Sequence, residues 1–359
     1  MTSQTPSTVP STVPSTVPST LSSVLSSLKK YEYLLASRSN TLVALETSVC
    51  ACFIITALLG NFLVLWIVYK NRNLRTIPNQ FVVSLALADI LMAAICAPPC
   101  LSVLISGRRT FGEFVCQFQG FAIATLACVS LLTMTLVAVN RYFLIVRPQQ
   151  YQRLFTPKKT KIMIVAVWIF SCCEPLPYLL SGHRYQYHAG KVFCFQVLEV
   201  DFFTLLGYIY VVVPIFVLTS CYYTVFKMLR EHQERIRSLR KSNNKSSTRR
   251  VSIEDINVTR TLFLTVCGFL ICWIPISIVD FIGFGQGTWE LSRQVYLMYT
   301  FLGQLSTTLN PFIYGVMNKT FRDEYKLMLC SCNLCSRKRK ETLDSDSSQQ
   351  TRISKCSFI

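Results

Sequence analysis

The sequence is poor in charge for its length. Only 15% of its 359 residues are charged, whereas a soluble domain carries about 25%. The shortage is concentrated in windows of about 20 residues that hold at most one charged side chain, a length that crosses the core of a bilayer. These windows are 47–69, 81–107, 114–140, 162–183, 202–226, 261–279 and 294–318. They predict an all-α membrane protein built as a bundle of seven transmembrane helices.

Motifs of several other protein classes are missing as well. The sequence has no P-loop, catalytic triad or zinc-ligand spacing, so we expect neither an enzyme nor a structural metal site. Internal repeats and paired mid-span charges, which are typical of transporters, are also missing, and a seven-span transporter is kept as the alternative. The formal net charge of +18 arises in short loops between the windows, which argues against nucleic-acid binding.

The basic residues indicate the orientation of the chain. With the N-terminus outside, 28 of the 36 Lys and Arg residues lie on the inner side and 8 on the outer side. This bias follows the positive-inside rule. The sequence therefore predicts a multi-pass protein of the plasma membrane with an extracellular N-terminus, whose basic inner surface faces anionic membrane lipids and a protein partner.

The two ends differ in composition from the membrane-spanning part. Residues 1–43 include the repeat TPSTVPSTVPSTVPST and are predicted to form a disordered extracellular segment. The membrane domain is expected at 44–330, and 331–359 are expected to form a disordered cytoplasmic tail. Near the end of the membrane domain, FRDEYKLMLC predicts a short amphipathic eighth helix. Three cysteines there are candidates for palmitoylation or, alternatively, ordinary cytosolic thiols: Cys330, Cys332 and Cys335.

Sixteen cysteines would suit a disulfide-rich protein, but most of them lie within the spans or on the inner side. There they act as small apolar residues. Cys116, at the outer start of the third span, and Cys194, in the loop before the fifth, are placed to meet in an oxidising compartment. We predict that these two residues form a disulfide bond.

A short motif lies on each span, in order along the chain. The motifs are GN at 60–61, LALAD at 85–89, NRY at 140–142, Trp168, Pro214 with Tyr222, CWIP at 272–275 and NPFIY at 310–314. In this order the sequence resembles the rhodopsin-like (class A) G-protein-coupled receptors from about Leu45 to Cys330. Within that family, VYKNRNLRTIPNQFVVSLALAD, NRY and FRDEY are most similar to melatonin-type receptors. The resemblance implies a receptor that binds an extracellular ligand and activates heterotrimeric G proteins by helix rearrangement.

Three prolines lie inside predicted spans, where each removes a main-chain hydrogen bond and permits a kink: Pro214, Pro275 and Pro311. Trp273 is a bulky side chain two residues before Pro275, and Phe269 is expected one turn below it. By resemblance, Trp273, Phe269, Pro275, Asn310 and Pro311 form the activation switch. The alternative is that Trp273 only fills the core.

Arg141 ends a long apolar span at the inner face, where its guanidinium can snorkel or pair. The resemblance implies that Arg141 contacts the G protein. The family usually has an acid directly before this arginine, and Asn140 stands there instead, so we expect raised basal signalling. Glu254 or Asp255 is a candidate replacement partner, or both are solvated loop residues. The residues implied at the G-protein site are Asn140, Arg141, Tyr142, Tyr222 and Tyr314.

Asp89 is the single charge of the second span. At ~1.5 Å per residue it lies near mid-bilayer, where an acid should face other polar groups. The polar residues at matching depth on other spans are Asn61, Ser130, Ser306 and Asn310. By resemblance this cluster binds a sodium ion in the inactive receptor, and oxygen ligands suit a hard cation. The alternative is a protonated Asp89 in a static hydrogen-bond network.

By the same resemblance, the ligand cavity opens outward above Trp273, between the third, fifth, sixth and seventh spans. Amine receptors of the family carry an Asp where this sequence has Ile123, and opsins carry a retinal-binding Lys where it has Gln304. Neither an amine pair at that position nor retinal is therefore expected. The predicted wall is apolar with a few amide and hydroxyl groups, which suits a neutral small ligand. It consists of Gln119, Ile123, Thr125 or Leu126, Asp280, Phe281, Thr300 and Gln304.

Asp280 is the counter-argument to a neutral ligand. Its carboxylate is available to a cationic ligand or a basic peptide, or else to Arg109 or water at the rim. A peptide-activated receptor of the same fold is therefore the alternative interpretation.

The inner loop and the tail carry candidate phosphorylation sites. RRVS at 249–252 places two arginines before Ser252, and the tail has three serines beside acids: Ser345, Ser347 and Ser348. Phosphorylation adds about −1.5 to −2 charges at each site, which suits a positively charged arrestin surface. Receptor kinases and arrestin are therefore expected partners.

Overall fold

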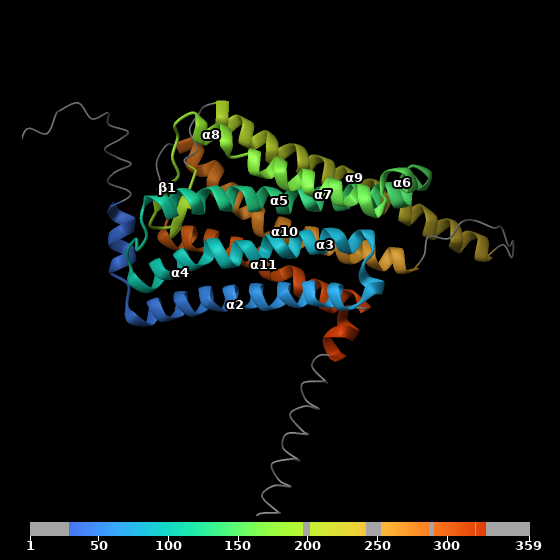
Figure 1. The fold of residues 1–359 in the computed structure, drawn as a ribbon, viewed down its shortest axis with the longest axis horizontal. Coiled ribbons are helices and arrows are strands. Elements are labelled where there is room, and N and C mark those ends of the chain that lie inside the picture. The colour runs from blue at the N-terminus through green and yellow to red at the C-terminus, as the bar shows by residue number, and fades with distance from the viewer. Residues whose placement is uncertain (1–28, 197–201, 242–252, 287–290, 320, 328–359) are drawn as a thin grey trace, which may run out of the picture.

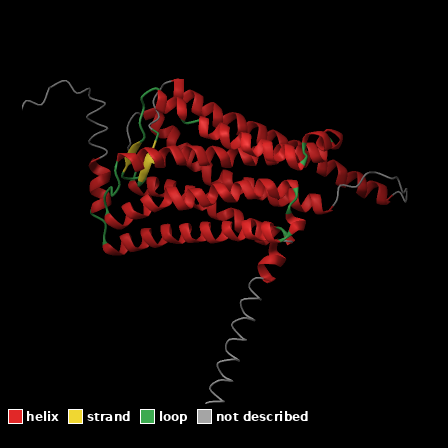
Figure 2. Cartoon of the chain, viewed as in Figure 1, coloured by secondary structure: helices red, strands yellow, loops and turns green. Residues whose placement is uncertain are grey.

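The structure is a computed structural model that describes residues 29–196, 202–241, 253–286, 291–319 and 321–327. Its long helices run side by side as one bundle (Figure 1). The described chain is almost entirely helical, apart from a two-stranded antiparallel hairpin at one end of the bundle (Figure 2). The elements are α2 (Asn40–Lys70), η1 (Arg72–Leu74), α3 (Ile77–Leu91), η2 (Met92–Cys96), α4 (Ala97–Ser106), α5 (Glu113–Val146), α6 (Pro148–Leu154), α7 (Pro157–Cys173), α8 (Leu176–Leu180), β1 (Gln186–His188), β2 (Phe193–Phe195), α9 (Phe202–Lys241), α10 (Ile253–Gln286) and α11 (Arg293–Met317).

The predicted seven-helix bundle is confirmed. Six segments are both long and apolar enough to cross a membrane: Asn40–Lys70, Ile77–Ser106, Glu113–Val146, Pro157–Leu180, Ile209–Glu231 and Ile256–Ile282. The seventh, α11, has 25 residues but is less apolar because it carries Arg, Gln, Ser, Thr and Asn side chains. It packs against both α10 and α2 and so closes the bundle.

The second span is not one regular helix, which its sequence did not reveal. A π-helical turn, η2, separates α3 from α4, and Pro98 and Pro99 follow in the first turn of α4. Proline has no N–H to donate, and a π turn shifts the main-chain hydrogen bonds to accommodate it. The irregular turn begins three residues after Asp89, and its Met92 and Cys96 side chains line the cavities described below.

Part of the predicted N-terminal segment 1–43 lies within the described residues and is helical. Residues 29–36 are helical, and Tyr31 and Leu35 are buried against the outer end of the bundle. The Tyr31 hydroxyl donates a hydrogen bond to the Leu291 carbonyl at 2.6 Å. At the other end of the chain, residues 321–327 form the predicted amphipathic helix, with Phe321 buried and Leu327 61% exposed.

The surface of the bundle is apolar along the helices. Large side chains such as Ile169, Phe216 and Ile271 are exposed there. Polar groups such as Asp89 and Asn310 are instead buried between the helices. This inversion of a soluble protein's pattern is what a lipid-facing bundle requires.

Candidate functional site

Two adjoining cavities occupy the outer half of the bundle. The first, of about 280 Å³, lies among α5, α7, α9 and α10, and the second, of about 240 Å³, reaches η2, α4 and α11. Trp273 and Asp280 line both of them. The second cavity is also lined by Ile123, Thr300 and Gln304, so the structure brings together four of the predicted wall residues: Ile123, Asp280, Thr300 and Gln304.

The other residues predicted for the cavity wall line neither cavity. Gln119 is only 1% exposed, donates to the Cys96 carbonyl at 2.8 Å and accepts from the Cys194 amide at 3.1 Å. Phe281 is 68% exposed on the outside of the bundle. Thr125 and Leu126 are buried but line neither cavity. For Thr125 and Leu126 the prediction was wrong because Ile123, Ala124 and Ala127 share the cavity-facing side of α5, and helical periodicity turns the residues between them away.

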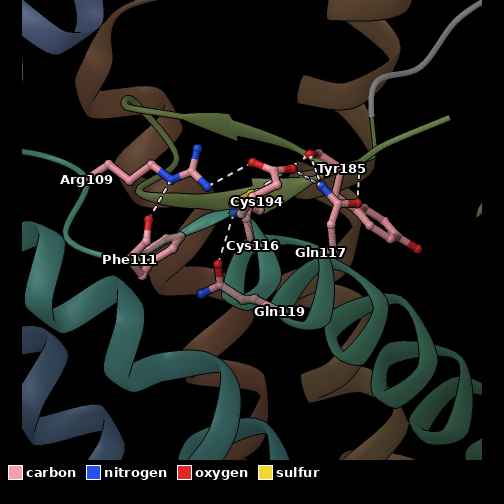
Figure 3. A network of polar contacts seen from close by, with 8 residues as sticks. Arg109, Phe111, Cys116, Gln117, Gln119, Tyr185 and Cys194 are labelled. Carbon is pink, nitrogen blue, oxygen red and sulfur yellow. Dashed lines mark hydrogen bonds and ion pairs between the residues drawn. A yellow bond between two sulfur atoms is a disulfide. The ribbon is translucent and has the colours of Figure 1, made fainter.

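The hairpin β1–β2 lies against the outer end of α5 (Figure 3). The predicted disulfide between Cys116 and Cys194 is confirmed and ties β2 to α5. Gln117 strengthens this attachment, since its amide donates to the Tyr185 carbonyl at 2.9 Å and accepts from the Tyr185 amide at 3.0 Å. Gly120 lies under the ring of Tyr185, where a Cβ atom would approach ring carbon Cγ to 2.3 Å. The hairpin is therefore held closely over the cavities.

Asp280 has a partner that the sequence did not suggest. The Lys191 ammonium, from the turn of the hairpin, lies 2.9 Å from Asp280 Oδ1, and the Tyr299 hydroxyl donates to Oδ2 at 2.9 Å. Arg109, which was a candidate partner, instead pairs with Glu113 at 3.1 Å and donates to the Phe111 carbonyl. Burial lowers the pKa of Lys191, and the Asp280 carboxylate opposes that shift.

Glu174 is a second cavity residue that sequence reasoning missed. It follows α7 and lines the first cavity, and its Oε1 lies 3.8 Å from the position that a Cβ atom on Gly207 would take. Among the described residues its carboxyl group has no hydrogen-bond or ion-pair partner. The available signal was its place as the single acid in the window 162–183.

Two of the predicted switch residues, Phe269 and Trp273, lie together beneath the cavities. The rings of Phe269 and Trp273 are stacked, with centroids 5.3 Å apart and planes 22° from parallel. Pro275 lies inside α10 and Pro311 inside α11. Trp273 also reaches a third, smaller cavity, so one side chain connects the outer cavities with the middle of the bundle.

That third cavity contains most of the predicted polar cluster. Asp89, Ser130, Ser306 and Asn310 line it, and the Asn310 amide donates to Asp89 Oδ2 at 2.8 Å. Its volume is about 10 Å³, which is room for about one water-sized particle. Three oxygen-bearing side chains and an amide around such a space fit a small hard cation.

Asn61 does not belong to this cavity, contrary to the prediction. Its amide donates to the carbonyls of Ala57 at 2.9 Å and Thr307 at 3.0 Å, and so links α2 to α11. The preceding Gly60 permits this close approach, because a Cβ atom there would lie 2.9 Å from Cγ of Pro311. The GN motif therefore joins two helices here.

Arg141 is enclosed at the inner end of α5. Its side chain is 1% exposed, and one of its guanidinium nitrogens donates to the Asn140 side-chain oxygen at 2.8 Å. Tyr222 and Tyr314 are buried in the inner half of the bundle, whereas Tyr142 packs its ring against Phe143. The neighbour that replaces the family's usual acid thus still contacts the arginine, but without a charge.

Several predicted sites lie outside the described residues. These are Ser252, Cys330, Cys332, Cys335, Ser345, Ser347 and Ser348, together with the side chains of Glu254 and Asp255. Their predicted roles in lipidation, phosphorylation and pairing with Arg141 stay predictions.

Comparison with known proteins agrees with this arrangement. The profile of the 7 transmembrane receptor (rhodopsin family) matches residues 60–314. The histamine H2 receptor of Homo sapiens is 28% identical over 314 residues, which cover 85% of each chain. Melatonin receptor type 1C of Gallus gallus is 27% identical over 281 residues, which cover 77% of this chain and 79% of that one. Melanopsin-B of Xenopus laevis is 25% identical over 298 residues, which cover 80% of this chain and 55% of that one.

The family match covers well over half of the chain, and its members are receptors rather than enzymes. The motifs on the seven helices, the Cys116–Cys194 disulfide and the cavities above Trp273 agree with it. The chain therefore belongs to the rhodopsin family of seven-transmembrane receptors and is a G-protein-coupled receptor.

Proposed function

We propose that this receptor lies in the plasma membrane with its N-terminus outside and is activated by a neutral small molecule in the two joined cavities. The proposal rests on the ion pair between Lys191 and Asp280. Asp280 lines both cavities, and the Lys191 ammonium neutralises its carboxylate. The rest of the wall is mainly apolar, with polar groups such as Thr300, Gln304 and Gln196. Such a lining favours an apolar ligand oriented by a few hydrogen bonds.

The names of the relatives supply two probes of different charge. Histamine carries an amine that is cationic at pH 7, whereas melatonin is neutral. We expect neutral compounds, with melatonin as the first probe, to stimulate nucleotide exchange on a reconstituted G protein, and we expect histamine and basic peptides to fail. Activation by an amine or a basic peptide that Asp280→Asn abolishes would contradict the neutral class. Activation by the basic peptide would favour the peptide-activated alternative.

Glu174 is the proposed hydrogen-bonding anchor of the first cavity. Its carboxyl group faces a mainly apolar space and has no partner among the described residues, so a ligand group that bonds to it gains a full hydrogen bond. Glu174→Leu should lower agonist potency by about tenfold, whereas Glu174→Gln, which keeps an acceptor oxygen, should remain near wild type. An equal loss in both variants would indicate a charged contact instead.

The cluster around Asp89 is the proposed sodium site of the inactive receptor. Asp89, Ser130 and Ser306 would supply oxygen ligands, and a bound sodium ion would balance the charge of the acid. Phe269 and Trp273 line the same cavity, so its contents can influence the switch.

Asp89→Asn tests this assignment. We expect it to remove the sodium dependence of agonist affinity and to impair nucleotide exchange. Asn61→Ser, outside the cavity, should keep the sodium effect. If the wild type shows no sodium effect and Asp89→Asn signals normally, the acid is only structural.

The inner end is the proposed docking site for the G protein, through Arg141, Tyr222 and Tyr314.

Phosphates at Ser252 and in the tail are proposed to recruit arrestin. Palmitates on Cys330, Cys332 or Cys335 are proposed to hold the helix at 321–327 on the membrane. A chain truncated after Cys335 should lose arrestin recruitment. Normal recruitment by that chain would contradict the role of the tail.

A further inference from the structure

The turn between β1 and β2 places the ammonium group of Lys191 inside the bundle. The Lys191 side chain is 0% exposed. Its main chain is fixed from two sides: His188 Nδ1 accepts from the amides of Gly190 and Lys191 at 3.1 Å each, and the Thr300 hydroxyl donates to the Lys191 carbonyl at 2.6 Å. The Cys116–Cys194 disulfide holds the adjacent strand. The position of the ammonium is thus determined by the fold of the hairpin.

Within the described part of the chain, that ammonium contacts one carboxylate and two aromatic faces. The nitrogen lies 2.9 Å from Asp280 Oδ1 and 4.2 Å from the ring centroids of both Phe195 and Tyr299. The Tyr299 hydroxyl donates to the other oxygen of Asp280, which fixes the carboxylate and the ring together. Aromatic faces around a cation are the means by which proteins recognise organic ammonium ligands.

We propose that Asp280, Phe195 and Tyr299 form a binding site for organic ammonium groups, and that Lys191 of the same chain is its resident ligand. The three residues come from β2, α10 and α11, so the site exists only in the folded receptor. Asp280 lines both outer cavities, and the tethered ammonium therefore keeps cationic ligands away from it. This last consequence rests on the proposed function, whereas the ammonium site itself does not.

Chemical rescue tests the site without knowledge of the natural ligand. Lys191→Ala removes the ammonium and most of its stem, which leaves the carboxylate and the two rings without their cation. We expect Lys191→Ala to melt below the wild type, and ethylammonium chloride to raise its melting temperature by several degrees in a saturable manner. Ethanol, a neutral molecule of similar size, and sodium chloride at equal concentration should have no such effect.

Two controls decide the outcome. The wild type, whose site is filled, and Lys191→Ala/Asp280→Asn, whose carboxylate is gone, should show no saturable rise with ethylammonium. No rise in Lys191→Ala, or an equal rise in either control, would overturn the proposal. If Lys191→Ala cannot be purified, its surface expression should fall below that of the double variant, and the reverse order would also overturn it. Melting and expression are read without signalling, so a failure here is distinct from a failure of the proposed ligand class.

Discussion

The outer end of the bundle is held by buried charges, and the inner end by apolar packing. At the outer end, Glu46 pairs with both Arg38 and Arg293, all with side chains almost fully buried, and Lys191 pairs with Asp280. At the inner end, rings pack on one another, with the centroids of Phe226 and Phe263 4.5 Å apart. The buried arginine there contacts the amide of its chain neighbour.

This difference indicates which end can rearrange. Buried ion pairs are directional, and losing one partner leaves a charge without compensation, so segments joined by them stay in register. Apolar packing is non-directional, and surfaces held by it can shift and repack at smaller cost. We therefore expect the end with the hairpin and the cavities to stay rigid and the end around Arg141 to rearrange when a G protein binds.

Arg141→Ala should have the largest effect on the inner end. Nucleotide exchange on a reconstituted G protein should be lost almost completely while surface expression stays near the wild type, because we propose that Arg141 contacts the G protein. Arg147→Ala, an exposed arginine just beyond α5, is the matched control and should signal normally. Unchanged exchange in Arg141→Ala would remove this residue from the coupling site.

Glu46→Leu should be the most damaging change at the outer end. It leaves Arg38 and Arg293 buried without their shared carboxylate, which costs about 3–5 kcal/mol. Thermal unfolding of the purified receptor should shift to clearly lower temperature. Glu46→Gln, which keeps the hydrogen-bond acceptor and loses the charge, should shift less. Equal stability of Glu46→Leu and wild type would show that the outer end does not depend on this cluster.

Lowering the pH should reduce the stability of the folded protein, because His188 at the outer end resists protonation. Burial and the nearby charge of Lys191 lower its pKa to about 3, while the unfolded value is about 6.5. Below pH 6.5 the unfolded chain thus binds a proton that the native chain does not, and stability is lost as the pH falls toward 3. At pH 5 the loss is at most about 2 kcal/mol.

The measurement is melting temperature against pH for the wild type and His188→Asn. The asparagine oxygen can still accept a hydrogen bond from the turn but does not titrate. The wild type should therefore lose more stability between pH 7 and pH 5 than the variant does. Parallel curves would show that His188 is not the responsible group.

Asn140→Asp should have the smallest effect and would make the inner end more like the outer one. A charged acceptor beside Arg141 strengthens the existing contact by about 1 kcal/mol, so basal nucleotide exchange should fall by about fivefold. Asn140→Ala removes the acceptor and should raise basal exchange. A higher basal rate in Asn140→Asp would contradict the view that this neighbour restrains the arginine.

Residues whose positions depend on local pattern were predicted well. The charge-poor windows and the Trp273–Phe269 stack follow from spacing along the chain, and the Asp89–Asn310 contact follows from matching depth in the membrane and the family resemblance. Gln119 and Asn61 were assigned to the wrong neighbours, because their depth in the membrane was right but the face of the helix was not. Depth can be counted along a sequence, whereas the rotation of a helix about its axis depends on what packs against it.

The sequence by itself determined the seven spans, the receptor family and the disulfide. The spans depend on composition, the family on the order of the motifs, and the disulfide on two cysteines that lie on the oxidising outer side. Only the tertiary structure decided that Lys191 meets Asp280 and that Glu46 holds two arginines. Lys191 and Asp280 are 89 residues apart and Glu46 and Arg293 are 247 residues apart, and these charges lie in a hairpin turn and near helix ends, where they follow no periodic pattern. Their partners are selected by the path of the hairpin and the packing of the helices, and by the cost of burying any charge that remains unmatched.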